Sequence, residues 1–436
     1  MVEPTIIPRA EHALSRRDVD PDALKVLYRL RDHGYAAYLV GGSVRDLLLG
    51  RRPKDFDIST SAHPYEIKKL FRNCWIIGRR FRLAHVKFGA KTIEVATFRR
   101  QLTEAEMAPP PAPERPQAPG DEGASGDPRR RRGGRHAAHP HHNTFGTAEE
   151  DAFRRDFTVN ALFYDIASFS IIDYVGGLKD LEVRLVRCIG DPDVRFHEDP
   201  VRMLRAVVLA ARLDLRIEPP IFDAISRNRS LLATAAPARL LEEYFKILRS
   251  GAAERTFLAL RDAGLLKPVT PELHRPPAAL WESLRALDAY RARFPSAPDT
   301  LTNPVIIGAL LSPLGLLARR LSEIRDTEDQ APRAMLGMLP VARRDVERLR
   351  LILSLQRRLF DLQAPPRVQQ GLTTRPLFGE ALTWLEVHGD RPDAVQHWQA
   401  RLEPGSVPSP SEDQGRRTGR RRRRRRRRPR GAVPPE

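Results

Sequence analysis

The spacing of apolar residues changes once along this chain, near Glu198, and the change limits the folds that it can adopt. Before Glu198, short segments alternate at period two or form brief apolar runs, which are the patterns of strands. After Glu198, apolar residues recur at the helical spacing as far as about residue 400. This order predicts an α/β domain followed by an all-α region. We find no repeat of fixed period, which argues against a solenoid.

Individual elements follow from the same patterns. Residues 21–33 are expected to form a helix, residues 35–40 a strand and residues 44–49 a short helix. Segments 55–60 and 91–98 alternate at period two and are expected to be strands. Three of the later helices are expected at 201–213, 238–251 and 253–266.

Two segments have too little apolar content to form a core. Residues 104–142 are rich in proline, then arginine, then histidine, and we expect a mobile insertion within one domain. Residues 420–428 are nine consecutive arginines, which repel one another, so the basic C-terminal tail is expected to be disordered. The insertion's histidines have no cysteine nearby and are assigned to solvated loop rather than to a metal site: His136, His139, His141 and His142.

The amino-acid composition limits the kinds of partner and the compartment that we expect for this chain. The 436 residues carry 74 Lys and Arg against 55 Asp and Glu, a formal charge of +19, which favours a polyanion such as nucleic acid over an acidic protein. Two cysteines are too few for a disulfide framework. The chain has no apolar run long enough to span a membrane, and its N-terminus lacks the apolar core of a signal peptide. We therefore expect a soluble cytoplasmic protein with no membrane partner.

Asp55 and Asp57 are the first candidates for chemistry. At positions i and i+2 of a strand, both carboxylates point the same way, roughly 6–7 Å apart. Two acids directed at one point repel unless a cation intervenes, and hard oxygen ligands suit Mg²⁺ bound together with substrate phosphates. The alternative is a solvated strand edge, since an Asp-x-Asp triplet is common.

Two further segments carry polar groups suited to a nucleotide. In LVGGSVRDLLLG, Gly41 and Gly42 allow the backbone to approach a triphosphate, although an ordinary turn with Ser43 as N-cap is the alternative. RRDFTVNALFYD supplies two arginines and a third carboxylate, Asp156. That carboxylate can equally be structural and paired with a neighbouring arginine.

EDPVRMLRA has two compatible interpretations. Asp199 makes a good N-cap and Pro200 suits the first helical position. Arg202 and Arg205 lie on one face of that helix with Asp199 one turn back, so donors and an acceptor can meet the edge of a base.

The motifs LVGGSVRDLLLG, KDFDIST, RRDFTVNAL, DYVGGLKDL and EDPVRMLRA, in this order, resemble the nucleotidyltransferases that comprise bacterial poly(A) polymerases and CCA-adding enzymes. The resemblance covers roughly residues 21–266. It implies a nucleotidyltransferase head with a small mixed sheet and helices, an all-α neck and an all-α body. It also implies domain bounds, which we place at 1–20 for an N-terminal extension, 21–180 for the head, 181–270 for the neck, 271–405 for the body and 406–436 for the tail.

The resemblance also implies roles. Asp55 and Asp57 would be catalytic and hold Mg²⁺, with Asp156 as a further catalytic carboxylate, and Glu94 competes for that place but ranks behind Asp156. DYVGGLKDL would be a hinge at Gly176 and Gly177, with a tight turn as the alternative. Nucleotide contacts would come from Gly41, Gly42, Arg45, Arg155, Asp199, Arg202 and Arg205.

IIGRRFRLAHV favours one branch of the family. Its Arg79, Arg80 and Phe81 resemble the stretch that marks the poly(A) polymerases, and they suit contact with RNA. We therefore predict transfer of AMP from ATP to an RNA 3′-hydroxyl, with RNA 3′ ends, ATP and RNA-decay proteins as the partners. The alternatives are a CCA-adding enzyme acting on tRNA and an RNA-binding scaffold without catalysis.

Overall fold

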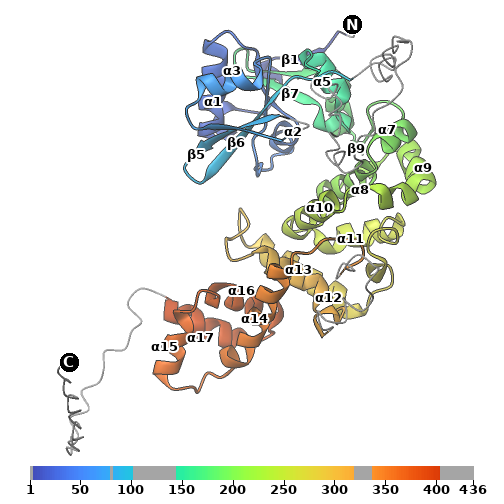
Figure 1. The fold of residues 1–436 in the computed structure, drawn as a ribbon. Helices are drawn as coiled ribbons and strands as arrows, with labels where there is room; N and C mark the ends of the chain where they lie inside the picture. Colours follow the sequence, from blue (N-terminus) through green and yellow to red (C-terminus); the bar gives the residue numbers. More distant parts are fainter. Residues whose placement is uncertain (1–2, 79–81, 102–143, 319–335, 403–436) are drawn as a thin grey trace, which may run out of the picture.

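The computed structural model describes residues 3–78, 82–101, 144–318 and 336–402. Figure 1 shows a head built around a β-sheet, followed by helices that extend away from it in chain order. The expected α/β head and helical remainder are therefore confirmed. The expectations for 104–142 and 406–436 concern residues outside the described part.

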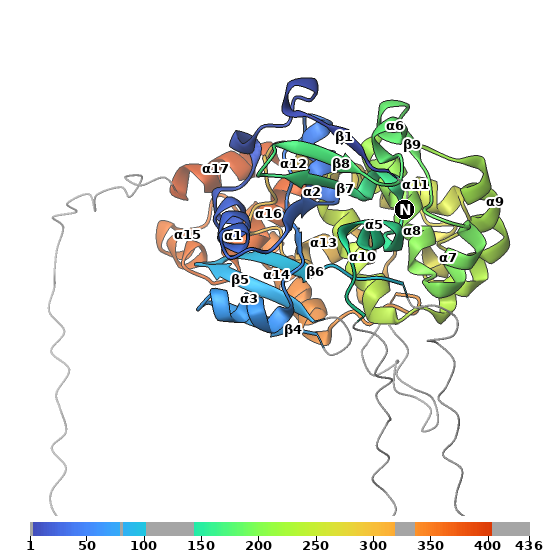
Figure 2. The same ribbon diagram turned by 90° about the horizontal axis from the view of Figure 1, so that it is seen from above.

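In the described part of the chain, the head contains a mixed sheet of eight strands in the order β1-β8-β7-β2-β3-β6-β5-β4. β3 and β6 are parallel, and all other neighbouring strands are antiparallel. Seen from above in Figure 2, β1, β8 and β7 lie together at one end of the sheet, with β5 and β4 at the other. The strands are β1 (Thr5–Ile7), β2 (Ala37–Val40), β3 (Ile58–Thr60), β4 (Cys74–Ile77), β5 (Leu83–Phe88), β6 (Lys91–Thr97), β7 (Leu162–Asp165) and β8 (Ser170–Asp173).

Helices α1 (Pro21–Asp32) and α3 (Pro64–Leu70) pack on the strands. α1 begins at Pro21 because Asp20 caps it, accepting the N–H groups of residues 22 and 23. Its apolar face is buried as the spacing predicts. Two shorter helices, α2 (Gly42–Leu48) and α5 (Ala148–Arg154), border the candidate site described below.

Three details differ from the sequence-based expectations. β3 begins at Ile58 and not at Asp55. Among residues 55–57, only the Asp57 carbonyl accepts a backbone hydrogen bond from the neighbouring strand, from the Val40 N–H at 3.0 Å. Residues 3–20 belong to the head and are not an extension, since β1 pairs with β8 and both Leu14 and Val19 are buried. The neck also contains a small parallel pair of strands.

That pair is β9 (Leu185–Val186) with β10 (Arg216–Ile217), and the remaining elements after the head are helical. α13 is buried at every position from residue 304 to 311 and packs against α10, α12 and α14, so it forms the centre of the body. No helix of the described residues is long and apolar enough to cross a membrane. The helices are α6 (Gly177–Glu182), α7 (Pro192–Glu198), α8 (Val201–Leu213), α9 (Pro219–Asn228), α10 (Pro237–Arg249), α11 (Ala253–Asp262), α12 (Ala278–Ala292), α13 (Asn303–Leu311), α14 (Arg343–Phe360), α15 (Pro366–Thr373), α16 (Phe378–His388) and α17 (Pro392–Leu402).

The glycine pair between head and neck forms a tight turn. The Asp173 carboxylate accepts the four successive backbone N–H groups of residues 175–178, at 2.9–3.1 Å. Gly176 has a φ of +84°, which favours glycine. A Cβ on Gly177 would lie 2.2 Å from the Thr158 carbonyl oxygen, so this position requires glycine for a close approach. The turn interpretation of this segment therefore matches the structure.

We expect Gly177→Ala to lower the free energy of unfolding by about 1–3 kcal/mol, because the added methyl group must displace backbone. Gly371→Ala is the matched control, since Gly371 lies in α15 with no atom within 4 Å of the position that its Cβ would take. The control should be neutral or slightly stabilising. Denaturant unfolding of both variants measures the difference, and equal stability would contradict the close-contact argument.

Candidate active site

A pocket of about 590 Å³ lies between the sheet and the neck helices α8 and α10. The β2–α2 turn, β3, the segment after α5 and both neck helices contribute to its wall. Asp55 does not line this pocket, and Arg79, Arg80 and Phe81 lie outside the described residues. Nine of the expected site residues do line it: Gly41, Gly42, Arg45, Asp57, Arg155, Asp156, Asp199, Arg202 and Arg205.

The glycine turn brings backbone and a cation together. Gly41 has a φ of +72°, and a Cβ there would lie 2.8 Å from Nη1 of Arg155. Glycine therefore permits both the turn and the approach of the guanidinium. The alternative interpretation, an ordinary turn with Ser43 as N-cap, does not match, because the helix begins at Gly42 and the Ser43 hydroxyl donates to the Val40 carbonyl at 2.9 Å.

Two arginines on this side of the pocket are held in fixed positions. Arg155 donates to the Asn160 carbonyl at 3.1 Å, to Ser59 at 3.3 Å and to Asp151 at 3.1 Å. Arg45 is almost fully buried and is bound by Asp46 at 2.6 Å and by the Asn160 side chain. Arg155 is the more available of the two to a ligand.

Asp55, Asp57 and Glu94 form the acidic part of the site. The parallel pairing of Ile58 with Val95 places Asp57 beside Glu94 on neighbouring strands. The surface of Asp57 is open to solvent, but many protein atoms lie close around its carboxyl group and displace part of the water there. This loss of water raises the pKa of Asp57 to about 6, and the negative charges of Glu94 and Asp55 raise it further. The charges of Arg155 and Lys246 act in the opposite direction.

Asp156 occupies a different environment. It is buried and forms an ion pair with Arg205 at 2.7 Å, while Asn160 and the Phe157 N–H donate to its other oxygen at 3.1 and 2.8 Å. Burial alone would raise the pKa of Asp156, but Arg205 and these hydrogen bonds hold it below its usual value. Glu94 thus lies beside Asp57 on the neighbouring strand, whereas Asp156 lines the pocket in its pair with Arg205, and the ranking of Asp156 before Glu94 as the third catalytic carboxylate stays a prediction. The structural alternative for Asp156, pairing with an arginine, is the arrangement observed.

Asp199 and Arg202 are engaged with protein partners. Asp199 accepts a bidentate pair of bonds from Arg239 of α10, at 2.7 and 3.1 Å, and also the Val201 N–H at 3.3 Å. Arg202 donates to Glu198 at 2.8 Å and to the Arg195 carbonyl at 3.0 Å. The expected N-cap is displaced by one residue, because α8 begins at Val201 with Pro200 at its N-cap, and the Asp199 carboxylate accepts only the Val201 N–H just inside the helix.

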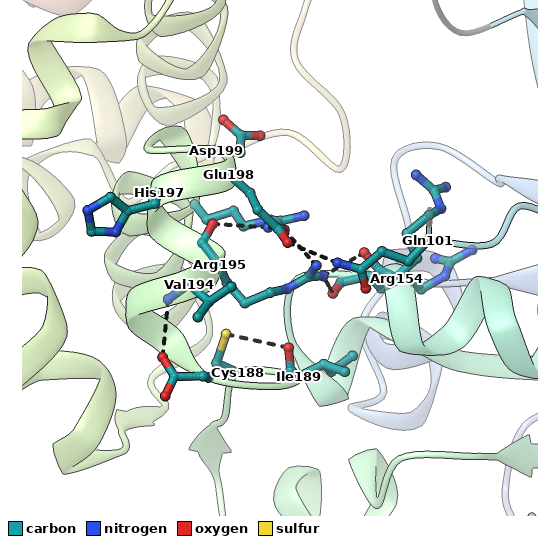
Figure 3. Close-up of polar contacts among 12 residues, drawn as sticks. Gln101, Arg154, Cys188, Ile189, Val194, Arg195, His197, Glu198 and Asp199 are labelled. Carbon is teal, nitrogen blue, oxygen red and sulfur yellow. Dashed lines mark hydrogen bonds and ion pairs between the residues drawn. The ribbon is translucent and has the colours of Figure 1, made fainter. Parts of the chain in front are cut away.

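Figure 3 shows the contacts at the junction of head and neck, which centre on Arg195. Its Nη2 donates to the carbonyls of Arg154 and Arg155, at 2.7 and 2.6 Å, and its Nη1 donates to Glu198 at 2.8 Å. Glu198 also accepts from Gln101 of the head at 2.9 Å. Arg195 is buried, so it fixes the end of α5 against α7.

Several of these residues were missed from the sequence, namely Arg195, Arg239 and Lys246. Arg239 and Lys246 could have been found, because together with Glu243 they fall at positions i, i+4 and i+7 on one face of a helix that the spacing predicts. Glu243 and Lys246 line the pocket from α10. For Arg195 the sequence showed at most the i, i+3 spacing to Glu198, since its two other partners are main-chain carbonyls far away in the sequence.

The pocket is suited to a polyanion next to carboxylates. Its wall has seven cationic side chains against five carboxylates. No three His, Cys, Asp or Glu side chains of the described residues are grouped closely enough to hold a metal by themselves. A cation at Asp55 and Asp57 would thus need ligand phosphates and water, as Mg²⁺ commonly does. The seven cations are Arg45, Arg154, Arg155, Arg202, Arg205, Arg212 and Lys246.

Comparison with known proteins identifies related chains. The family model "Poly A polymerase head domain" matches residues 37–187, and the model "Probable RNA and SrmB- binding site of polymerase A" matches residues 214–275. Poly(A) polymerase I of Salmonella typhi is 49% identical over 271 residues, which are 62% of this chain and 54% of that protein. The CCA-adding enzyme of Lactobacillus johnsonii is 38% identical over 248 residues, 57% of this chain and 54% of that protein.

A solved structure is also similar. The crystal structure of the Bacillus stearothermophilus CCA-adding enzyme in complex with CTP aligns with a TM-score of 0.57 at 28% identity, covering 88% of this chain and 82% of that one. The chain spans about half the length of the curated relatives that it matches.

We expect divalent cations to bind more weakly as the pH falls through about 6. The pKa of Asp57 is raised in the folded chain, so without a cation the ionised carboxyl is disfavoured until the pH rises above about 6. A proton must then leave before a cation binds, which weakens binding by up to about tenfold for each pH unit below 6. Titration with Mn²⁺ from pH 5 to 7.5 measures this, with Asp57→Asn as the control that removes the dependence. Binding that does not vary with pH would contradict the raised pKa.

We expect Arg195→Ala to lower the free energy of unfolding by about 3 kcal/mol, because it leaves Glu198 and two carbonyls without their donor. Arg227→Ala is the matched control, since Arg227 forms an exposed ion pair with Asp193 at 2.6 Å. That control should cost less than about 1 kcal/mol. Similar losses in the two variants would show that the junction does not depend on Arg195.

Proposed function

We propose, because the chain belongs to the family of the poly A polymerase head domain, that it transfers AMP from ATP to the 3′-hydroxyl of RNA and releases pyrophosphate. The observation that carries the proposal is the position of Asp57, which lies on the wall of a pocket rich in arginine. A triphosphate needs cations along its length, and phosphoryl transfer depends mainly on position and charge.

The phosphates are proposed to lie against the Gly41–Gly42 turn. Gly41 leaves no side chain between the ligand and the backbone, and Arg155 is already oriented there by Ser59 and Asp151. Because these bonds fix the guanidinium before a ligand arrives, little reorganisation is needed on binding. Arg45 supports the same wall through Asn160.

Asp55 and Asp57 are proposed to hold Mg²⁺ together with phosphate oxygens. The metal would supply neutralisation of the phosphate charge and a lower pKa for the attacking hydroxyl. Glu94, beside Asp57, would orient the acceptor end of the site and keep the carboxylate cluster strongly negative. Asp156 is proposed to act on this site indirectly, by fixing Asn160 and Arg205.

Asp199 and Arg202 are proposed to contact the base. An acceptor beside a donor matches the Watson–Crick edge of adenine, which offers an amino group and a ring nitrogen. Cytosine offers the same pair, so these two residues alone do not separate ATP from CTP. Binding of a base would replace the contacts with Arg239 and Glu198.

Polyadenylation is preferred to CCA addition because the more similar of the two curated relatives above, at 49% identity, is called poly(A) polymerase I. The CCA-adding alternative is supported by the relative at 38% identity and by the solved structure with CTP. A scaffold without catalysis is disfavoured, because Asp55, Asp57 and Glu94 are all present.

The proposal extends to partners and location. Residues 214–275 match a model whose description names RNA and SrmB, so we propose that this segment binds RNA and a protein of RNA metabolism, as RNA-decay proteins are. A cytoplasmic location is included, since ATP and RNA 3′ ends occur together there.

We expect Mg²⁺-dependent extension of both an unstructured RNA and a tRNA without its CCA end, with ATP as the preferred nucleotide. Labelled RNAs supplied with each nucleotide separately measure this. Addition limited to the tRNA, requiring CTP before ATP, would replace the proposal with CCA addition.

Asp57→Asn should lower the rate of RNA extension at least about a hundredfold by removing a ligand of the metal. Asp32→Asn, an exposed aspartate of α1, is the control with full activity.

A further inference from the structure

The open face of strands β4, β5 and β6 carries exposed side chains beside the candidate active site. Residues of these strands alternate between buried and exposed positions, so one face packs into the core. On the other face, Trp75 is 51% exposed, Ile77 is 49% exposed and the Glu94 side chain is 52% exposed. Ala96, two residues after Glu94, lines the pocket, so this is the face on which the site lies.

Strand register joins this face to the carboxylates in one row. Trp75 pairs with His85, and His85 pairs with Glu94. Glu94 lies beside Asp57 through the parallel pairing of β6 with β3. Three strand spacings of about 4.8 Å separate Asp57 from Trp75, or about 14 Å. The His85 ring nitrogen lies 3.6 Å from Glu94 in the middle of the row.

The outer end of the row combines an aromatic ring with a cation, since Lys87 Nζ lies 5.3 Å from the centre of the exposed Trp75 ring. An aromatic ring that stacks on a base, next to a cation that meets a phosphate, is the combination that single-stranded nucleic acid uses. A protein strand at this edge would not need the cation.

The geometry of an in-line reaction also favours this face for the acceptor. In an in-line displacement the attacking oxygen enters opposite the leaving pyrophosphate. The Gly41 turn and Arg155, which are proposed to hold the phosphates, lie on the β2 side of Asp57. The acceptor therefore has to arrive from the β5 and β4 side, where Trp75 lies.

We propose that the RNA strand leading to the reactive 3′ end runs along the open face of β6, β5 and β4, with one base stacked on Trp75 and a neighbouring phosphate on Lys87. The proposal rests on the proposed function for the identity of the strand. It assigns the acceptor to this face and leaves the pocket to the nucleotide.

The first test separates the two substrates kinetically. In the full chain, Trp75→Ala should raise KM for a short oligoadenylate by about tenfold or more and leave KM for ATP unchanged. Trp75→Phe should restore most of the affinity, because it keeps a ring. Phe222→Ala, which removes a ring that is 45% exposed on α9, should change neither constant. A rise in both constants for Trp75→Ala, or no rise in either, overturns the proposal.

The second test does not depend on activity. Of the four tryptophans, Trp384 and Trp398 are buried and Trp281 is half-buried in α12 beside Arg261, whereas Trp75 is 51% exposed, so Trp75 is the one that an oligoadenylate is expected to quench most. If the quenching disappears in Trp75→Phe, the proposed stacking of RNA on Trp75 is supported. This holds even if the chain extends no RNA, and a failure to extend RNA would overturn only the proposed function. If the quenching persists in Trp75→Phe, the proposed stacking on Trp75 is overturned. A change in oligomeric state in Trp75→Ala without an effect on RNA also overturns it, in favour of strand pairing at the β4 edge.

Discussion

The ion pair between Asp156 and Arg205 spans the boundary between the sheet-bearing head and helix α8, and the walls of the pocket depend on it. A carboxylate removed from water needs charged or hydrogen-bonding partners, and Asp156 has Arg205, Asn160 and a backbone N–H. Asn160 in turn binds Arg45 of α2. One buried charge thus sets the distance between the turn that faces the phosphates and the helix that faces the base.

Arg195 complements this pair from the other side of the junction. The Asp156 carboxylate accepts bonds from several donors, whereas the Arg195 guanidinium donates to the two carbonyls at the end of α5. The segment between them, residues 154–156, is held from both directions. This explains how Arg155, which lies just beyond the end of α5, is held in a defined orientation.

Local elements of this fold were predictable, and its long-range pairings were not. The helix beginning at Pro21 follows from its spacing, and the turn at Gly41 follows from the glycine pair. The place of Glu94 beside Asp57 depends on β6 pairing with β3, although β4 and β5 lie between them in the sequence. Period-two alternation shows that β6 has two faces, but it does not show which strand is its neighbour. The sequence therefore could not show that Glu94 lies beside Asp57.

Strand β1, at the edge of the sheet, influences how the chain folds. β1 is synthesised before its partner β8, which ends at Asp173, so Thr5 waits for most of the head to emerge before it can pair. Bringing such distant segments together costs loop-closure entropy before any contact is gained, and folding slows as the sequence separation of contacts grows. Until β8 is made, β1 has no partner strand, and unpaired strands invite association with other chains. The head is therefore expected to be vulnerable to aggregation during synthesis in a way that its helical remainder, rich in local contacts, is not.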